Sequence, residues 1–181
     1  MKRLLMLVAL ILGINATHAQ IQTATLKASG LTCSMCSKAV YDALTKVDFV
    51  KSVKANIQKS EYTIQLDDTK KIELSQLAEA VEDAGFSVAE MFITTKLSNL
   101  TVKNDAHIEM NGALLHFVNV PTTTVDGMVT LRLLDKVFAG DKTHKKYAQY
   151  TAMECYNTGY EATCCNTKSN GTKARMYHVT L

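Results

Sequence analysis

Cys33 and Cys36 are the residues of this 181-residue chain whose type and spacing most directly suggest chemistry. Two sulfurs separated by two residues can converge on one ion. Two thiolates without further ligands suit a soft metal ion of low coordination number better than zinc, which usually takes four ligands. The same spacing permits a disulfide bond or a redox-active pair, above all in an oxidising compartment. Spacing alone leaves these three interpretations open.

The elements that must position the two cysteines follow from the pattern of apolar residues. Alternation from Ile21 to Ala28 predicts a half-buried strand that stops at Gly30. Apolar residues at helical spacing from Cys36 to Val47 predict an amphipathic helix. The cysteines therefore lie at the start of a helix, where free backbone N–H groups favour the thiolate, the form that binds metal.

The rest of the first half continues this alternation of strands and helices. Two alternating runs, Val53 to Ile57 and Tyr62 to Leu66, predict a hairpin. A second helix is expected from Leu74 to Ala84 with Gly85 as its left-handed cap, and a last strand from Phe86 to Ile93. The order strand, helix, strand, strand, helix, strand predicts an α+β domain of the ferredoxin-like split βαβ type.

The second half is predicted to be a smaller, mainly β domain with a barrel-like shape. The polar stretch 94–99 marks the boundary, which gives a first domain over residues 20–94 and a second over residues 97–181. Strand-like runs cover residues 113–120, 128–137 and 174–181, and turn signals stand at Asn111-Gly112, Asp126-Gly127 and Asn170-Gly171. The sequence leaves the role of this second domain open.

Residues 1–19 have the order of a secretory signal peptide. Lys2 and Arg3 precede an apolar run from Leu4 to Ile14, and we expect cleavage after Ala19. The alternative, a retained membrane anchor, would need a longer apolar run. The mature protein is therefore expected to be exported, either to the periplasm or out of the cell.

Charge and motifs exclude several classes of function. The formal net charge of the chain is +3, and loss of Lys2 and Arg3 lowers it to +1. A near-neutral chain without a cluster of basic residues gives no indication of nucleic-acid binding. No nucleophile elbow, phosphate loop or paired-carboxylate pattern is present. We therefore expect a protein that is not an enzyme, holds no organic cofactor and binds no nucleic acid.

The segment Gly30 to Cys36, Gly-Leu-Thr-Cys-Ser-Met-Cys, resembles the Gly-Met-Thr-Cys-x-x-Cys signature of heavy-metal-associated domains. Copper chaperones, modules of copper-transporting ATPases and the periplasmic mercury-binding protein belong to this family. The resemblance covers about residues 22–93. Two residues in or near this loop differ from the family pattern. Leu31 replaces the usual Met and keeps its volume, and Phe86 stands where cytosolic copper chaperones commonly carry Lys.

The resemblance implies that Cys33 and Cys36 bind a soft ion, Cu(I) or Hg(II). It also implies a carrier that transfers the ion to a membrane metal transporter or to another metal-binding domain. One alternative is a periplasmic thiol-disulfide oxidoreductase that uses the same pair. Thioredoxin-like folds have a Trp before the motif and a proline opposite the active cysteines. This chain has no Trp, and its one proline, Pro121, lies in the second half. The other alternative is an inert Cys33–Cys36 disulfide in a structural protein.

Three further cysteines in the second half bring the total to five, an odd number for an exported protein. A disulfide from Cys155 to Cys164 or Cys165 is the favoured prediction. The alternative is a second metal site formed by these cysteines with His144 or His178. The four histidines of this half share no ligand spacing and are expected to be surface or core residues. They are His107, His116, His144 and His178.

Overall fold

The computed structural model of the protein describes residues 20–163, 165 and 174–181. The predicted signal peptide, Cys164 and the predicted turn at Asn170-Gly171 lie outside these residues. Within the described ranges, no helix is both long enough and apolar enough to cross a membrane.

Strands from both halves of the chain build one mixed sheet. They are β1 (Gln20–Ser29), β2 (Val50–Asn56), β3 (Glu61–Leu66), β4 (Ser87–Val102), β5 (His107–Met110), β6 (Ala113–Phe117), β7 (Thr123–Leu133) and β8 (Met176–Thr180). The helices are α2 (Ser34–Leu44), α3 (Ser75–Asp83), α4 (Lys136–Tyr147) and α5 (Cys155–Thr158), with short 3-10 turns η1 (Ile57–Lys59) and η2 (Ala148–Tyr150). The eight strands follow the order β2-β3-β1-β4-β7-β8-β6-β5.

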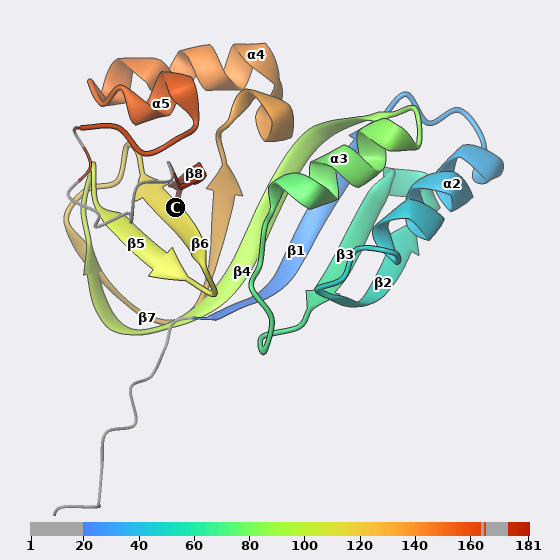
Figure 1. Cartoon of the computed structure of the whole chain (residues 1–181), viewed down its shortest axis with the longest axis horizontal. Helices are drawn as coiled ribbons and strands as arrows, with labels where there is room; N and C mark the ends of the chain where they lie inside the picture. Colours follow the sequence, from blue (N-terminus) through green and yellow to red (C-terminus); the bar gives the residue numbers. More distant parts are fainter. Residues whose placement is uncertain (1–19, 164, 166–173) are drawn as a thin grey trace, which may run out of the picture.

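The first half has the predicted α+β arrangement. β1 pairs antiparallel with β3 and with β4, and β2 pairs with β3, so the two strands of the hairpin lie at one edge of the sheet. Figure 1 shows α2 and α3 side by side on the same face of these strands. Gly85, with a φ of +87°, adopts the left-handed conformation expected after the second helix. The ferredoxin-like split βαβ order is thereby confirmed.

β4 is longer than the predicted strand and runs through the expected boundary at residues 94–99. The polar character of this stretch concealed its continued alternation. Thr95 points inward and is fully buried, and its hydroxyl donates to the carbonyl of Gln20 at 2.8 Å. A satisfied hydroxyl can occupy a core position of a strand, so the alternation continues through a polar residue. Both halves therefore share one sheet, and a division at residues 94–97 stays a prediction.

The second half forms the extra β part, and Figure 1 shows its strands strongly curved, with α4 and α5 at one end. The predicted turn at Asn111-Gly112 is confirmed, because both residues have positive φ and join β5 to β6. The turn predicted at Asp126-Gly127 is wrong. Gly127 lies inside β7 opposite Leu97, and the register shifts between Leu97 and Leu100 of β4, so its φ of +97° belongs to an irregularity of the ladder rather than to a chain reversal.

The run 128–137, predicted as one strand, is also divided differently in the structure. β7 begins earlier, at Thr123, and ends at Leu133, and α4 starts at Lys136. Apolar residues continue across this junction, so their pattern alone does not reveal where the strand gives way to the helix. Asp135 precedes α4, but its carboxylate hydrogen-bonds His178 of β8 and makes no side-chain cap on the helix.

Asn111, in the turn between β5 and β6, joins the two halves. Its side-chain oxygen accepts from the N–H of Ile21 at 2.8 Å, and its side-chain nitrogen donates to the carbonyl of Asp68 at 3.0 Å. Its own carbonyl accepts from the N–H of Ile72 at 2.9 Å. The largest cluster of buried apolar side chains likewise includes residues of both halves. The second half therefore supports the segment that leads into α3.

Candidate metal site

The loop from Gly30 to Cys33 connects β1 to α2 and sets the positions of both cysteines. Gly30, with a φ of +85°, turns the chain away from the sheet in a conformation that other residues rarely adopt. Cys33 has extended backbone angles and is the N-cap of α2, whereas Cys36 lies within the first turn of the helix. The helix therefore holds Cys36 in place, whereas Cys33 lies outside the helix and is less restrained.

The two sulfur atoms face each other at the surface. Their Sγ atoms lie 2.8 Å apart, and both residues are free cysteines. The N–H of Cys36 donates to Cys33 Sγ at 3.4 Å. This backbone donor is one of the helix N–H groups that lack a partner within the helix. The geometry therefore supplies two converging sulfurs and a backbone dipole directed at one of them.

The loop lowers the pKa of the Cys36 thiol below its ordinary value. The contact with the Cys33 side chain lowers the pKa of Cys36 most, and hydrogen bonds from the backbone and the hydroxyl of Thr32 lower it further, to about 7. The Thr32 Oγ1 to Cys36 Sγ distance is 3.8 Å. A thiol with this pKa is partly thiolate at neutral pH, and the thiolate is the form that binds metal or attacks an electrophile.

A buried contact fixes the start of α2 on the sheet. The hydroxyl of Tyr62 in β3 donates to the carbonyl of Ser37 at 3.1 Å and lies 2.9 Å from Ser37 Oγ. Tyr62 is fully buried and Ser37 is 3% exposed. Because Ser37 follows Cys36 directly, this contact restricts the position of the Cys36 sulfur.

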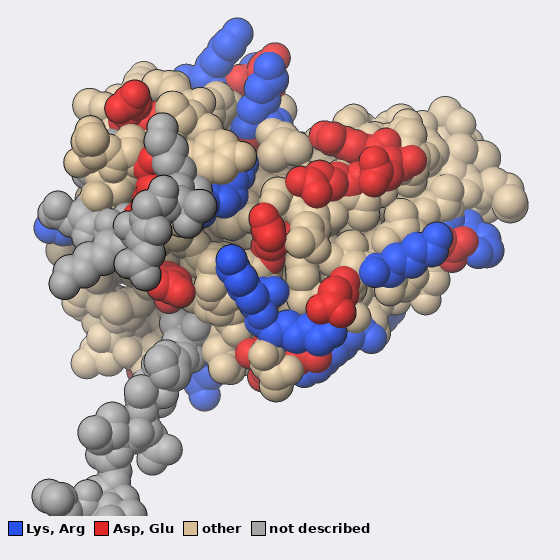
Figure 2. Space-filling view, in the orientation of Figure 1, with Lys and Arg blue, Asp and Glu red and all other residues tan. Residues whose placement is uncertain are grey.

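The surroundings of the loop are apolar and uncharged. Leu31 packs against the core, and a Cβ at Gly30 would lie 3.7 Å from the ring of Phe86, so that ring lies beside the loop. Met35 is 72% exposed and points away from the core. Figure 2 shows acidic side chains gathered over α3 and no charge at the tip where α2 begins. No residue from Ser29 to Cys36 is charged, so the sulfurs alone would balance the charge of a bound ion.

A family model of the heavy-metal-associated domain matches residues 25–87, which include both cysteines and Phe86. A mercuric transport protein periplasmic component from Pseudomonas fluorescens is 38% identical over 86 residues, 48% of this chain and 93% of that protein. The chain belongs to the heavy-metal-associated domain family. Copper chaperone CopZ from Staphylococcus aureus is 36% identical over 63 residues, 35% of this chain and 91% of the chaperone.

One solved structure, described as a CopZ metallochaperone, is 35% identical to this heavy-metal-associated domain protein, with a TM-score of 0.34. The aligned part covers 36% of this chain and 97% of that structure. The family match ends at residue 87 and leaves β5 to β8 outside. The relatives are named as a transport component and a chaperone, and no comparison supports the thiol-disulfide oxidoreductase alternative.

The cysteines of the second half are placed differently from the predicted second site. Cys155 lies beside His116, with 3.7 Å between its Sγ and His116 Nδ1, whereas His144 stacks on Tyr156. Cys165 belongs to the same buried cluster as Cys155. Cys164 lies outside the described residues, so the disulfide from Cys155 to Cys164 or Cys165 stays a prediction.

Sequence reasoning missed that His107 and His116 are neighbours, although a signal for this was present. The two residues stand symmetrically about the Asn111-Gly112 turn. A two-residue hairpin turn fixes the register of the strands that it joins. In the structure this register pairs His107 of β5 with His116 of β6.

Proposed function

We propose that this chain is an exported metallochaperone that binds one soft metal ion, Cu(I) or Hg(II), between Cys33 and Cys36 and passes it to a partner. One observation carries the proposal: two sulfurs 2.8 Å apart at the start of α2, on exposed Cys33 and half-buried Cys36. The pKa of about 7 for Cys36 supports it, because little free energy is needed to remove that proton when the ion binds.

Loading requires the two sulfurs to move apart, and the loop suggests which of them moves. If each metal–sulfur bond is about 2.3 Å, as for zinc, two sulfurs on opposite sides of an ion stand about 4.6 Å apart. Cys36 lies within α2, and its neighbour Ser37 is held by Tyr62. Cys33 is exposed and precedes the helix. We therefore expect Cys33 to swing outward on loading, while Cys36 stays in place.

The same asymmetry gives an order for release. A thiolate of the partner would displace Cys33 first, because that ligand is the less restrained, and Cys36 would leave last. The ion would thus always keep at least two sulfur ligands. The partner is a membrane metal transporter or another metal-binding domain that offers its own thiolates. The relative named as a periplasmic transport component supports an exported location. Cleavage near Ala19 would be the step that releases the mature chain.

Anaerobic titration with Cu(I) against a competing chelator tests the proposal. The chain from residue 20 should take up about one ion at this loop, and Cys33→Ser/Cys36→Ser should lose that uptake. Met35→Leu is the matched control, because Met35 is in the same loop but points outward, and it should bind as tightly as the parent. Uptake that is unchanged in the double cysteine variant would overturn the proposed site.

A second titration with Hg(II) decides between the two ions. A protein that competes for Hg(II) and fails to compete for Cu(I) would be a mercury carrier. A protein that competes for neither ion would not be a metallochaperone. Single variants test the order of release: an ion held by Cys33 alone, in Cys36→Ser, should pass to an acceptor domain faster than an ion held by Cys36 alone, in Cys33→Ser.

A further inference from the structure

Three histidines of the second half lie in a row across adjacent strands. His107 of β5 pairs with His116 of β6, and His116 pairs with His178 of β8. Residues paired across a sheet project from the same face about 5 Å apart. The ring centroids of His107 and His116 are accordingly 4.7 Å apart, and those of His116 and His178 are 5.2 Å apart. His116 and His178 are fully buried.

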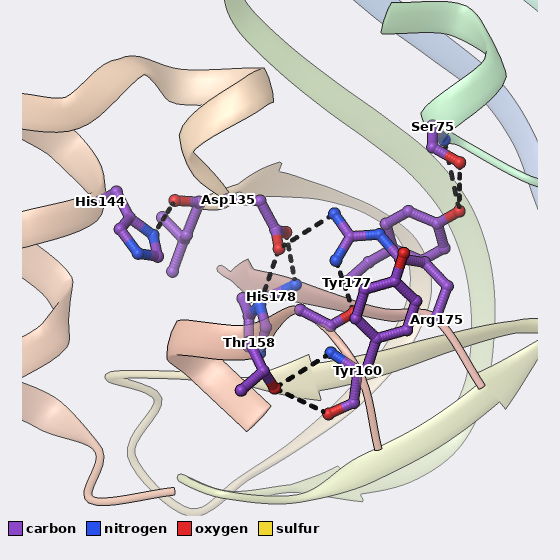
Figure 3. A network of polar contacts seen from close by, with 10 residues as sticks. Ser75, Asp135, His144, Thr158, Tyr160, Arg175, Tyr177 and His178 are labelled. Atoms are coloured by element: carbon purple, nitrogen blue, oxygen red, sulfur yellow. Dashed lines mark hydrogen bonds and ion pairs between the residues drawn. The ribbon is translucent and has the colours of Figure 1, made fainter. Parts of the chain in front are cut away.

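Carboxylates orient two of the three rings. His116 Nε2 lies 3.0 Å from Asp105 Oδ1, which also accepts from the hydroxyl of Thr151 at 2.7 Å. An ionised carboxylate only accepts, so Nε2 carries the proton and the lone pair of His116 is on Nδ1. Figure 3 shows the equivalent contact of His178, whose Nδ1 lies 2.9 Å from Asp135 Oδ1.

The lone pair of His116 faces a sulfur. His116 Nδ1 and Cys155 Sγ are 3.7 Å apart. His107, His116 and Cys155 each offer one atom that could bind a metal ion, and these three atoms lie within 4.8 Å of one another. In addition, His107 Nε2 is buried and has no hydrogen-bond partner among the residues that the structure describes. Buried polar atoms are normally satisfied, so an orphaned imidazole nitrogen beside a second imidazole and a sulfur points to a ligand.

We propose that His107, His116 and Cys155 form a second metal site, which binds a copper or zinc ion. These are the common ions whose ligand preferences include both imidazole and thiolate. At a tetrahedral ion, bonds of about 2.0 Å to nitrogen and 2.3 Å to sulfur place the two donors about 3.5 Å apart. The observed 3.7 Å for His116 and Cys155 is close to this value, and the ligand atom of His107 lies within 4.8 Å of both.

The surroundings suit a bound ion. Burial lowers the pKa of His116 to about 4 and also lowers the pKa of His107, so both rings are neutral at physiological pH, as metal ligands must be. Asp105 takes the position of the carboxylate that orients a metal-ligating histidine through its other ring nitrogen. Cys155 and His116 are fully buried and His107 is half-buried, so most of the site is shielded from bulk solvent. The site thus differs from the exposed pair at Cys33 and Cys36 and suits retention of an ion rather than its exchange.

The test uses Cys33→Ser/Cys36→Ser protein under anaerobic reducing conditions, so that the first loop does not contribute. Cu(I) and Zn(II) are titrated separately against chelators, and X-ray absorption of the loaded protein counts nitrogen and sulfur ligands. We expect about one ion, bound to two imidazole nitrogens and one sulfur. The arm with the tighter binding identifies the ion. Failure to compete in both arms, or a ligand shell without sulfur, would overturn the proposal.

Substitutions then assign the ligands. Cys155→Ser and His107→Gln should each remove competitive binding, and Asp105→Asn should weaken it by about 10- to 100-fold, as for other groups that orient a ligand. His144→Gln is the matched control, because His144 stacks on Tyr156 outside the cluster, and it should bind normally. Circular dichroism melts identify variants that fail to fold. Folded Cys155→Ser and His107→Gln proteins that bind like the control would refute the site.

The number of bound ions shows which of the two proposed sites is wrong. Loss of the first site alone would leave one ion bound in both the parent and the Cys33→Ser/Cys36→Ser protein. Loss of the second site alone would leave one ion in the parent and none in that variant. Mass spectrometry that finds Cys155 in a disulfide in the metal-loaded protein would also overturn the second site.

Discussion

Tyr62→Phe should destabilise the protein by about 2 kcal/mol, because it removes the buried hydroxyl that holds the start of α2. The hydroxyl has two contacts with Ser37, at 3.1 Å to its carbonyl and 2.9 Å to its Oγ. A neutral hydrogen bond contributes about 0.5–1.5 kcal/mol, and a buried group left without its partner costs about 1–3 kcal/mol. For a chain of this size, about 2 kcal/mol corresponds to a decrease in Tm of about 4–8 °C.

A double-mutant cycle separates the contact from other effects of the substitution. Ser37→Ala alone should cost about 1 kcal/mol, because the Tyr62 hydroxyl can still donate to the carbonyl of residue 37. The double variant should cost less than the two single variants together, by about 1 kcal/mol, since neither hydroxyl is then left without the other. Urea unfolding followed by circular dichroism measures all the free energies on the same footing.

Tyr41→Phe is the matched control for this cycle. Tyr41 is on the same helix but is 37% exposed, so its substitution should change stability by less than about 0.5 kcal/mol. Tyr62→Phe should also weaken competitive Cu(I) uptake, because Ser37 follows Cys36 directly. Equal stabilities for Tyr62→Phe and Tyr41→Phe, or strict additivity in the cycle, would refute the anchoring role of the hydroxyl.

Two further predictions concern the acidity of the loop and the junction of the halves. Alkylation of Cys36 by iodoacetamide, followed by tandem mass spectrometry, should increase with pH around a midpoint near 7, because its thiolate prevails above its lowered pKa. Cys33→Ala, which removes the largest cause of the shift, should move that midpoint toward the ordinary value of 9.0, and an unchanged midpoint would contradict the assignment. Asn111→Gly should lower the free energy of unfolding by about 1–3 kcal/mol, because it removes both side-chain bonds but tolerates the positive φ. Asn111→Ala should be about 1 kcal/mol less stable than Asn111→Gly, because alanine is strained at that φ. A urea unfolding experiment in which Asn111→Ala is the more stable of the two variants would contradict this.

The first half could be predicted from sequence because each of its elements carries a local signal. Alternation identified β1, helical periodicity identified α2 and α3, and Gly85 adopts the left-handed conformation expected at a cap. The cysteine pair was visible as a motif. Its asymmetry was not, because it depends on contacts between Tyr62 and Ser37, residues 25 positions apart in the chain.

The second half was harder because its decisive contacts are between distant segments. The carboxylate of Asp135 at the start of α4 holds His178 of β8, 43 positions further along. Parallel pairing then sets His178 beside His116, and no short turn announces a parallel pair. Gly127 has the residue type of a turn, but it lies within the β4–β7 ladder beside a register shift. Only the hairpin at Asn111-Gly112 had a register that local sequence could supply.

The continuous strand β4 has a practical consequence for any attempt to isolate the metal-binding part. Its residues from Phe92 to Val102 pair with β7. A fragment cut near residue 94 would lose β7 and present the remaining backbone of β4 to solvent as an unpaired edge. Such edges recruit strands from other molecules, which leads to aggregation. An expressed fragment should therefore keep β4 and β7 together, although the family match ends at residue 87.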